Sequence, residues 1–118
     1  MSLLQNQGVL IGAFQKGTLV GITSVENQPR GKVGNYRKMD ILFVSKQYRN
    51  QGIGANLLNL AKEKAKLFGG TKLYISAIPS KSTVDFYLRE GATLVSEIDK
   101  ELYQLEPDDI HLEVQIGF

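Results

Sequence analysis

The segment from residue 42 to residue 54, LFVSKQYRNQGIG, constrains the fold of this chain more than any other. Residues 41–44 are apolar in succession, which is typical of a central strand covered by helices. Glycines at positions 52 and 54 then open a helix that runs to about Phe68, where Gly69 and Gly70 end it. The helix carries an apolar stripe, with Lys64 as a polar exception, made of Ile53, Leu57, Leu60, Ala61 and Ala65.

The turn before this helix has the chemistry of an anion site. Glycines at a helix start let backbone N–H groups approach an anion closely, and the helix dipole favours negative charge there. Arg49 adds a cation, so the segment predicts binding of a phosphate or pyrophosphate. The P-loop string is absent, and the third glycine of the dinucleotide fingerprint is replaced by Leu57. The alternative is a glycine-containing turn that only starts a helix.

The remaining pattern predicts an α/β (α+β) fold with a mixed, mostly antiparallel, twisted sheet, a crossover helix and a short second helix. A second helix is expected at residues 82–90, with Ser80 or Ser82 as its N-cap and Gly91 as its stop. Residues 28–35 and 99–109 are expected to be loops. Strands are expected at residues 9–14, 18–25, 38–44, 73–78, 92–98 and 110–116.

Alternation along two of these strands predicts which face each side chain occupies. In residues 38–44, Met39 would share a face with Ile41 and Phe43, and Asp40 would share the other with Leu42 and Val44. In residues 110–116 the apolar residues alternate with His111, Glu113 and Gln115. His111 is therefore expected at the surface rather than in a catalytic site.

Composition excludes several classes of protein. The 118 residues, 42% of them hydrophobic and 22% charged, suit one globular domain. There is no cysteine and one histidine, so a thiolate or zinc site is not expected. No apolar run approaches the roughly 20 residues of a membrane helix, and the start lacks the features of a signal peptide. We expect a cytoplasmic protein with no membrane partner.

Charge is unevenly distributed along the chain. Residues 1–89 hold 13 basic and four acidic side chains, whereas residues 90–118 hold eight acidic side chains and Lys100. The basic part suits a polyphosphate ligand and the acidic part a cationic one, or both are simply solvated faces. No nucleic-acid partner is expected, because the chain has no recognition motif and no interleaving of aromatic and basic residues.

Two motifs together resemble the GNAT N-acetyltransferases. Arg49-x-x-Gly52-x-Gly54, between an apolar strand and an amphipathic helix, resembles the acetyl-CoA signature of that family. Residues 86–91, FYLREG, resemble its Phe-Tyr-x-x-x-Gly segment and lie at the expected distance. The resemblance implies a GNAT-like fold and an acetyltransferase that uses acetyl-CoA as co-substrate, with no metal.

The resemblance also implies which residues hold acetyl-CoA. The backbone of the central strand would pair with the pantetheine arm, and the amides before and within the first helical turn would hold the pyrophosphate. A family asparagine that contacts the cofactor is replaced here by the shorter Ser80. The implied cofactor-binding residues are Leu42, Phe43, Val44, Arg49, Asn50, Gln51, Gly52, Ile53, Gly54 and Ser80.

Tyr87 and Asp40 are the candidate catalytic residues. A phenol, with a pKa of about 10, stays protonated at neutral pH and can protonate the departing thiolate. The alternative for Tyr87 is packing beside Phe86. Some family members use a glutamate base at the position of Ile75, so Asp40 is the candidate base here, with Glu26 in reserve. Asp40 is otherwise a solvated strand-end carboxylate.

The chain departs from the family at its N-terminus. The family usually begins with a strand and two helices that form much of the acceptor-binding wall, and a single domain over residues 1–118 has no room for them. Either the chain is a fragment or another chain supplies that wall, so a bare sheet edge and a homodimer are expected. The expected activity is transfer to a primary amine of a small molecule or a protein. The alternative is a catalytically weak CoA-binding or sensory module.

Overall fold

The computed structural model describes residues 8–116, so the single-domain prediction extends past the described residues at both ends. A hairpin of β1 (Val9–Gln15) and β2 (Thr18–Val25) leads into β3 (Tyr36–Val44). A 3-10 turn, η1 (Lys46–Tyr48), precedes the long helix α1 (Ile53–Leu67). The remaining elements are β4 (Lys72–Ala77), α2 (Lys81–Arg89), β5 (Thr93–Leu94), α3 (Lys100–Leu105) and β6 (Ile110–Gln115).

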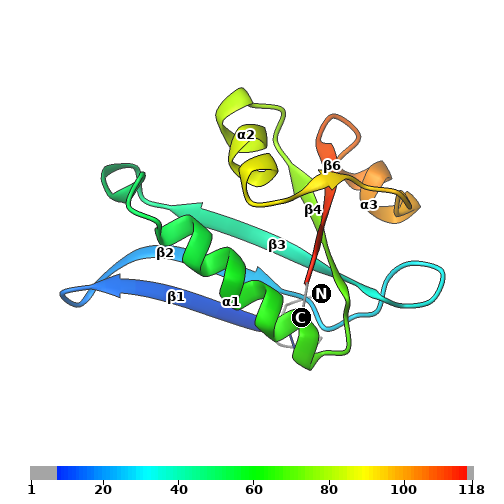
Figure 1. The fold of residues 1–118 in the computed structure, drawn as a ribbon, viewed down its shortest axis with the longest axis horizontal. Helices are drawn as coiled ribbons and strands as arrows, with labels where there is room; N and C mark the ends of the chain where they lie inside the picture. Colours follow the sequence, from blue (N-terminus) through cyan, green and yellow to red (C-terminus); the bar gives the residue numbers. More distant parts are fainter. Residues whose placement is uncertain (1–7, 117–118) are drawn as a thin grey trace.

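The strands form one sheet in the order β1-β2-β3-β4-β6-β5 (Figure 1). Every neighbouring pair is antiparallel except β3 and β4, which are parallel and joined through α1. The mixed, mostly antiparallel sheet and the crossover helix are confirmed. α1 ends as predicted, because Gly69, at φ 92°, and Gly70 return their N–H groups to the carbonyls of Lys66 and Ala65.

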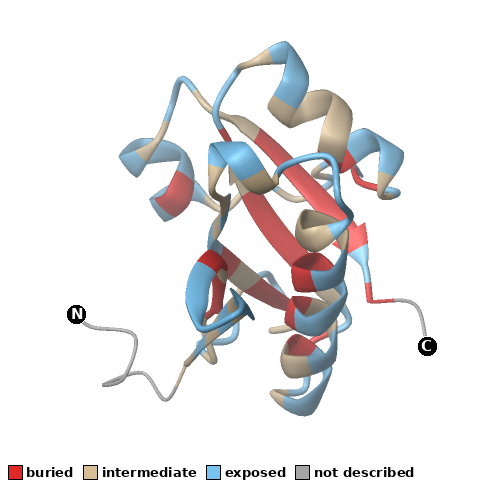
Figure 2. Ribbon diagram, turned by 90° about the vertical axis from the view of Figure 1, so that its left-hand side faces the viewer, coloured by how far each residue is buried: buried red, intermediate tan, exposed pale blue. Residues whose placement is uncertain are grey.

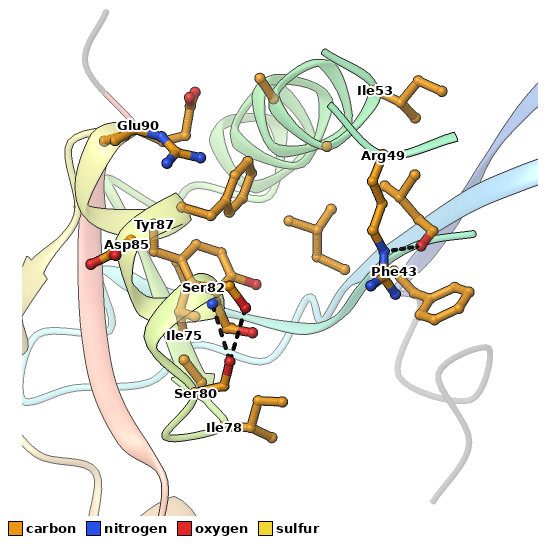
Figure 3. A pocket seen from close by; sticks show the side chains of 18 of the residues that line it. Phe43, Arg49, Ile53, Ile75, Ile78, Ser80, Ser82, Asp85, Tyr87 and Glu90 are labelled. Atoms are coloured by element: carbon orange, nitrogen blue, oxygen red, sulfur yellow. Dashed lines mark hydrogen bonds between the residues drawn. The ribbon is translucent and has the colours of Figure 1, made fainter. Parts of the chain in front are cut away.

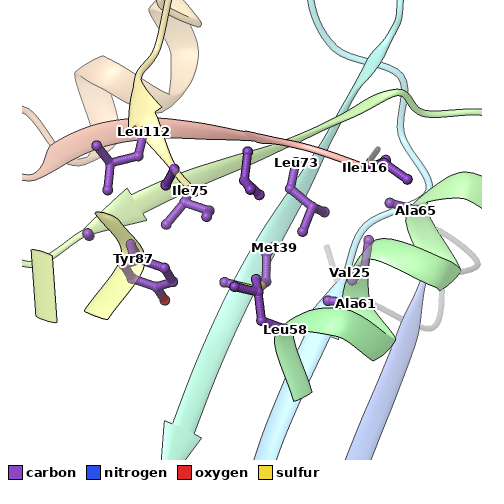
Figure 4. Packing of buried hydrophobic residues seen from close by; sticks show 13 residues of the cluster. Val25, Met39, Leu58, Ala61, Ala65, Leu73, Ile75, Tyr87, Leu112 and Ile116 are labelled. Carbon is purple, nitrogen blue, oxygen red and sulfur yellow. The ribbon is translucent and has the colours of Figure 1, made fainter. Parts of the chain in front are cut away.

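The main core lies between the sheet and the two helices α1 and α2. Leu58, Ala61 and Ala65 of α1 pack on Val25 and Met39 of the strands (Figure 4). Tyr87 of α2 belongs to the same cluster. Burial is concentrated on the central strands and the inner face of α1 (Figure 2). The predicted stripe on α1 is wrong at one position, since Leu60 is exposed and Leu58 is buried instead.

The prediction for residues 92–109 is wrong in two places. Only Thr93 and Leu94 form the expected strand. The Val95 N–H still donates to the His111 carbonyl at 3.1 Å, but the Ser96 N–H donates to the Glu113 side chain, and the ladder ends there. The expected loop contains α3, whose N-cap Asp99 accepts a hydrogen bond from the N–H of Leu102. This short helix covers the second face of the sheet.

His111 is buried at 5% exposure, so its predicted surface position is wrong. The missed helix α3 explains the error, because its Tyr103 ring lies 5.7 Å from the His111 ring. The imidazole is held within a polar layer: Nδ1 is 2.6 Å from the Tyr74 hydroxyl and Nε2 is 3.0 Å from the Glu106 carbonyl. The outward residues of β6 therefore face a second, smaller core.

Glu113 is also buried, within the same layer. Its carboxylate accepts hydrogen bonds from the Tyr36 hydroxyl at 2.6 Å and from the Ser96 N–H at 2.9 Å. It also forms an ion pair with Lys72 at 3.1 Å. Tyr36 and Lys72 face each other across β3 and β4, so Glu113 ties these two strands together where they still pair.

Candidate active site

The candidate site is a cleft where β3 and β4 separate. The two strands pair over only four residues each, residues 36–39 with residues 72–75. Beyond that point β3 continues to pair with β2, and the end of β4 continues to pair with β6. The resulting cleft has a volume of about 1360 Å³ and is walled by β3, β4, the start of α1 and one face of α2 (Figure 3).

A β-bulge in β3 lies at the fork of the cleft. Ser24 of β2 pairs with Ile41 and Val25 pairs with Met39, which leaves Asp40 as an extra residue. A bulge bends its strand and interrupts regular pairing. It also explains why the predicted alternation is wrong: Met39 and Leu42 both contribute to the core under α1.

The opposite face of β3 is open within the described part of the chain. Ile41 is 44% exposed and Phe43 is 53% exposed. The expectation of a strand covered by helices on both faces therefore holds only on the side of α1 and α2 at this point.

The start of α1 faces the cleft with free backbone donors. Gly52 is the N-cap residue in the left-handed conformation, at φ 81°, and no side chain caps the first turn. A side chain added at Gly52 would meet no atom within 4 Å, so this end of the helix is open to a ligand. The dipole of a 15-residue helix favours an anion here.

Gly54 has a different role. A Cβ atom at this position would lie 3.3 Å from the ring of Phe86 on α2. The missing side chain lets the first turn of α1 approach α2 closely. The second glycine of the motif therefore brings the two helical walls of the cleft together.

Arg49 is exposed at the mouth of the cleft and fixed to the end of β3. Its Nε donates a hydrogen bond to the carbonyl of Val44 at 3.0 Å. Its guanidinium lies 5.9 Å from the centre of the Phe43 ring. These contacts place a positive charge beside the open start of α1.

Tyr87 lies on the opposite wall, on α2, at 7% exposure (Figure 3). Burial raises the pKa of its phenol to about 12. No described residue hydrogen-bonds its hydroxyl. The ring also packs in the main core, as the packing alternative predicted, and the role of Tyr87 as a proton donor stays a prediction.

Ser80 lines the cleft and is the N-cap of α2, as expected. Its Oγ accepts a hydrogen bond from the N–H of Thr83 at 3.4 Å and lies 3.0 Å from the Oγ of Ser82. The hydroxyl is therefore shared between capping α2 and facing the cleft.

The cleft brings together nearly all the residues that the sequence singled out. Tyr87, Asp40 and every predicted cofactor-binding residue except Gln51 line it. It also contains Thr83 and Glu90, which the sequence analysis did not single out. Thr83 lies four residues before Tyr87 and Glu90 lies three residues after it. This helical spacing puts them on the same face as Tyr87, and it is the signal that would have indicated them.

Glu26, the reserve base, does not line the cleft but lies beside Asp40. Its side chain is 16% exposed and forms an ion pair with Arg30 at 3.3 Å. Burial raises the pKa of the Glu26 carboxyl, and the hydrogen bond and the negative charge of Asp40 raise it further. Arg30 and Lys38 act in the opposite direction without reversing the shift.

The part of the chain from residue 8 to residue 116 contains no group of three or more His, Cys, Asp or Glu side chains arranged to hold a metal ion. None of its helices is long and apolar enough to cross a membrane.

Comparison with solved structures gives close matches in fold. An aminoglycoside 6'-N-acetyltransferase complexed with coenzyme A superposes with a TM-score of 0.75 at 17% identity, over 98% of this chain and 77% of that one. The PaiA N-acetyltransferase of Thermoplasma acidophilum, in complex with coenzyme A, gives 0.73 at 20% identity, over 95% and 65%. A GNAT-family acetyltransferase of Staphylococcus aureus Mu50 gives 0.74 at 22% identity, over 97% and 71%.

The sequence comparisons add the family itself. No curated protein matches the chain. A family model described as an acetyltransferase (GNAT) domain matches residues 1–101. The chain therefore belongs to the GNAT acetyltransferases, and the enzyme class and acetyl-CoA as co-substrate follow from that membership.

Proposed function

We propose that the protein transfers the acetyl group of acetyl-CoA to a primary amine of a small molecule or a protein. The observation that carries the proposal is the cleft itself, which has the uncapped start of α1 on one wall and the buried Tyr87 on the other. A small-molecule acceptor is the first choice, since a structural neighbour acts on an aminoglycoside.

The chain offers a fitting partner for each part of the co-substrate. The first-turn N–H groups of α1 and the fixed charge of Arg49 suit a pyrophosphate. The backbone of residues 42–44, which has no partner strand on the β4 side, can pair with the amides of a pantetheine arm. Ser80 contributes a hydroxyl at the other wall.

Tyr87 is proposed to donate the proton that the departing sulfur needs. As the amine nitrogen forms a bond to the acetyl carbon, the carbon–sulfur bond breaks and its electron pair stays on sulfur. A thiol has a pKa of about 8.5. With the pKa of its phenol raised to about 12, Tyr87 is fully protonated at neutral pH and available as a hydrogen-bond and proton donor.

Asp40 is proposed to accept the proton that the amine loses. It lines the cleft at the fork between β3 and β4, whereas the position of the family's alternative base is the apolar Ile75. Lys38 lies 2.9 Å from the Asp40 carboxylate and holds it in place. Asp40 and Tyr87 thus both line the cleft that an acceptor would enter.

The second candidate is a catalytically weak CoA-binding or sensory module. The open face of β3, with Ile41 and Phe43 exposed, favours it because the described residues supply no wall on that side for an acceptor. We propose that a homodimer supplies this wall in the active form.

Steady-state release of free thiol from acetyl-CoA, measured over a panel of amines, tests the proposal. The transferase reading predicts release that depends on at least one amine. Calorimetric binding of acetyl-CoA with no release above hydrolysis across the panel would favour the binding module. Absence of binding would contradict both readings.

A further inference from the structure

We infer that Glu26 and Asp40 act as one carboxyl pair, in which Asp40 takes the acceptor's proton and Glu26 is the positioning residue that holds this proton by a hydrogen bond. The inference deepens the proposed function and rests on it. It adds a residue outside the cleft to the transfer step.

The backbone sets the two carboxyl groups side by side. Glu26 directly follows β2, and its N–H donates to the carbonyl of Lys38 at 2.9 Å. The bulge in β3 adds Asp40 two residues later. Glu26 thus lies opposite Lys38, whose ammonium reaches Asp40 at 2.9 Å, and Asp40 is close enough to raise the pKa of Glu26. The Glu26 side chain is 16% exposed and that of Asp40 is 28% exposed. A regular strand would not have this extra carboxyl.

Two cations, Arg30 and Lys38, contact the pair. Arg30 contacts Glu26 at 3.3 Å and is itself shared with Asp99 at 3.3 Å and Glu101 at 3.0 Å. Lys38 contacts Asp40 at 2.9 Å, and its other carboxylate neighbour, Glu106, is 3.9 Å away. The charge of Lys38 also acts on Glu26, where it and Arg30 lower the pKa without cancelling the rise caused by burial and by Asp40. The pair therefore still favours binding a proton in the presence of both cations.

This arrangement suits a base for an amine. An isolated carboxylate, with an ordinary pKa near 4, is a weak acceptor for the proton of an ammonium group. A second negative charge close by favours protonation of the pair, as it does in other carboxyl dyads. The raised pKa of Glu26, caused by burial and then by Asp40, is the expected signature.

The proton transfer from the amine involves only the amine, Asp40 and Glu26. The N–H bond of the attacking amine breaks and an O–H bond forms on Asp40, while the nitrogen electron pair forms the new C–N bond. Glu26 accepts a hydrogen bond from the protonated Asp40. The proton then leaves through the exposed side of Asp40 to solvent, which restores the pair.

The pH dependence of kcat/KM tests the pair directly. The acceptor should be an aromatic amine that is neutral over the whole pH range, so that the acidic limb reports the enzyme. Glu26→Gln keeps the size of the side chain and removes its charge. We expect the acidic limb to move to lower pH by about one unit and kcat to fall about tenfold.

Glu101→Gln is the matched control, because it also removes one carboxylate from Arg30 but does not contact Asp40. It should leave the limb and kcat within about twofold. A limb that moves equally in both variants, or in neither, would overturn the inference. Melting temperatures of both variants separate loss of folding from loss of rate.

A second measurement does not depend on turnover. Carbon-13 NMR titration of the Glu26 carboxyl in the free protein should shift to lower pH in Asp40→Asn and stay unchanged in Glu101→Gln. If the Glu26 carboxyl titrates at the same pH in Asp40→Asn as in wild type, the pairing of the two residues is overturned. If wild type turns over no amine while the titration behaves as expected, the proposed function fails and the pair itself stands.

Discussion

Replacing Glu113 by Gln tests the contacts of Glu113 with Tyr36 and Lys72, which join β3 and β4 where the two strands pair, beside the cleft. Burial alone would raise the pKa of the Glu113 carboxyl. Hydrogen bonds from Ser96 and Tyr36, and the contact with Lys72, outweigh burial and lower the pKa from 4.5 to about 2. Gln keeps the shape of the side chain and resembles the protonated acid, which has lost these charge-assisted interactions.

The expected loss follows from that difference. Folding lowers the pKa of Glu113 from 4.5 to about 2, and each pKa unit corresponds to about 1.36 kcal/mol. The ionised carboxylate therefore stabilises the fold by about 3 kcal/mol. A folded-state pKa below the unfolded value gives stability that is complete above pH 4.5 and is lost as the pH falls toward 2. The loss is a large part of the roughly 5–15 kcal/mol that holds a domain folded.

Urea unfolding at a series of pH values measures the effect. Glu113→Gln should be about 3 kcal/mol less stable than wild type at pH 7, and the difference should shrink steadily between pH 4.5 and pH 2. Glu63→Gln, at an exposed position on α1, is the control and should stay within about 0.5 kcal/mol throughout. A constant difference between Glu113→Gln and wild type across this range would refute the reasoning.

Three further predictions concern the cleft and its open face. Gly52→Asp should weaken acetyl-CoA binding at least about tenfold by calorimetry, because an acid at this helix start repels a pyrophosphate. The left-handed backbone at Gly52 disfavours the new side chain, so some fall in the melting temperature is expected. Gly17→Asp, at the same φ of 81° in open space on the β1–β2 turn, should leave binding unchanged, and equal losses would contradict the site. Tyr87→Phe should lower kcat about 10²-fold in steady-state thiol release with little change in acetyl-CoA affinity, and an unchanged kcat where chemistry limits the rate would leave packing as its only role. Light scattering at high micromolar concentration should give the mass of a dimer for the wild type, and a monomeric mass would exclude the dimer. Phe14 is an apolar residue that is 65% exposed, and Phe14→Asp should convert the dimer to a monomer.

The start of α1 was predictable because its signals are local. Gly52 adopts the left-handed backbone that glycine accepts readily, and Arg49 lies close in sequence to the strand end that it contacts. The two glycines that end α1 are equally local. The strand, turn and helix therefore follow from residue type and spacing alone.

The second core was missed because its signals are not local. His111 and Glu113 alternate with apolar residues as solvent-facing side chains do, and only α3 and Tyr36 show that this face is covered. Asp99 is a good N-cap for α3, but the polar stretch around it has the composition of a loop. Burial of polar side chains depends on partners that lie far away in sequence.

The faces of the sheet that the β3 side chains occupy were predicted wrongly for a related reason. Alternation assumes one residue per pairing step, and nothing in residues 38–44 marks the extra residue. Only the register with β2 reveals it.

That extra residue has a consequence at the level of the gene. Met39 and Leu42 face the helices on either side of Asp40, and a strand without Asp40 would keep both of them inward and Ile41 outward. The hydrophobic core thus places no requirement on the inserted position. One codon supplies both the bend that opens the sheet and the carboxyl at its fork, so this fold can gain or lose both through a single three-base insertion or deletion, with no compensating change in the core.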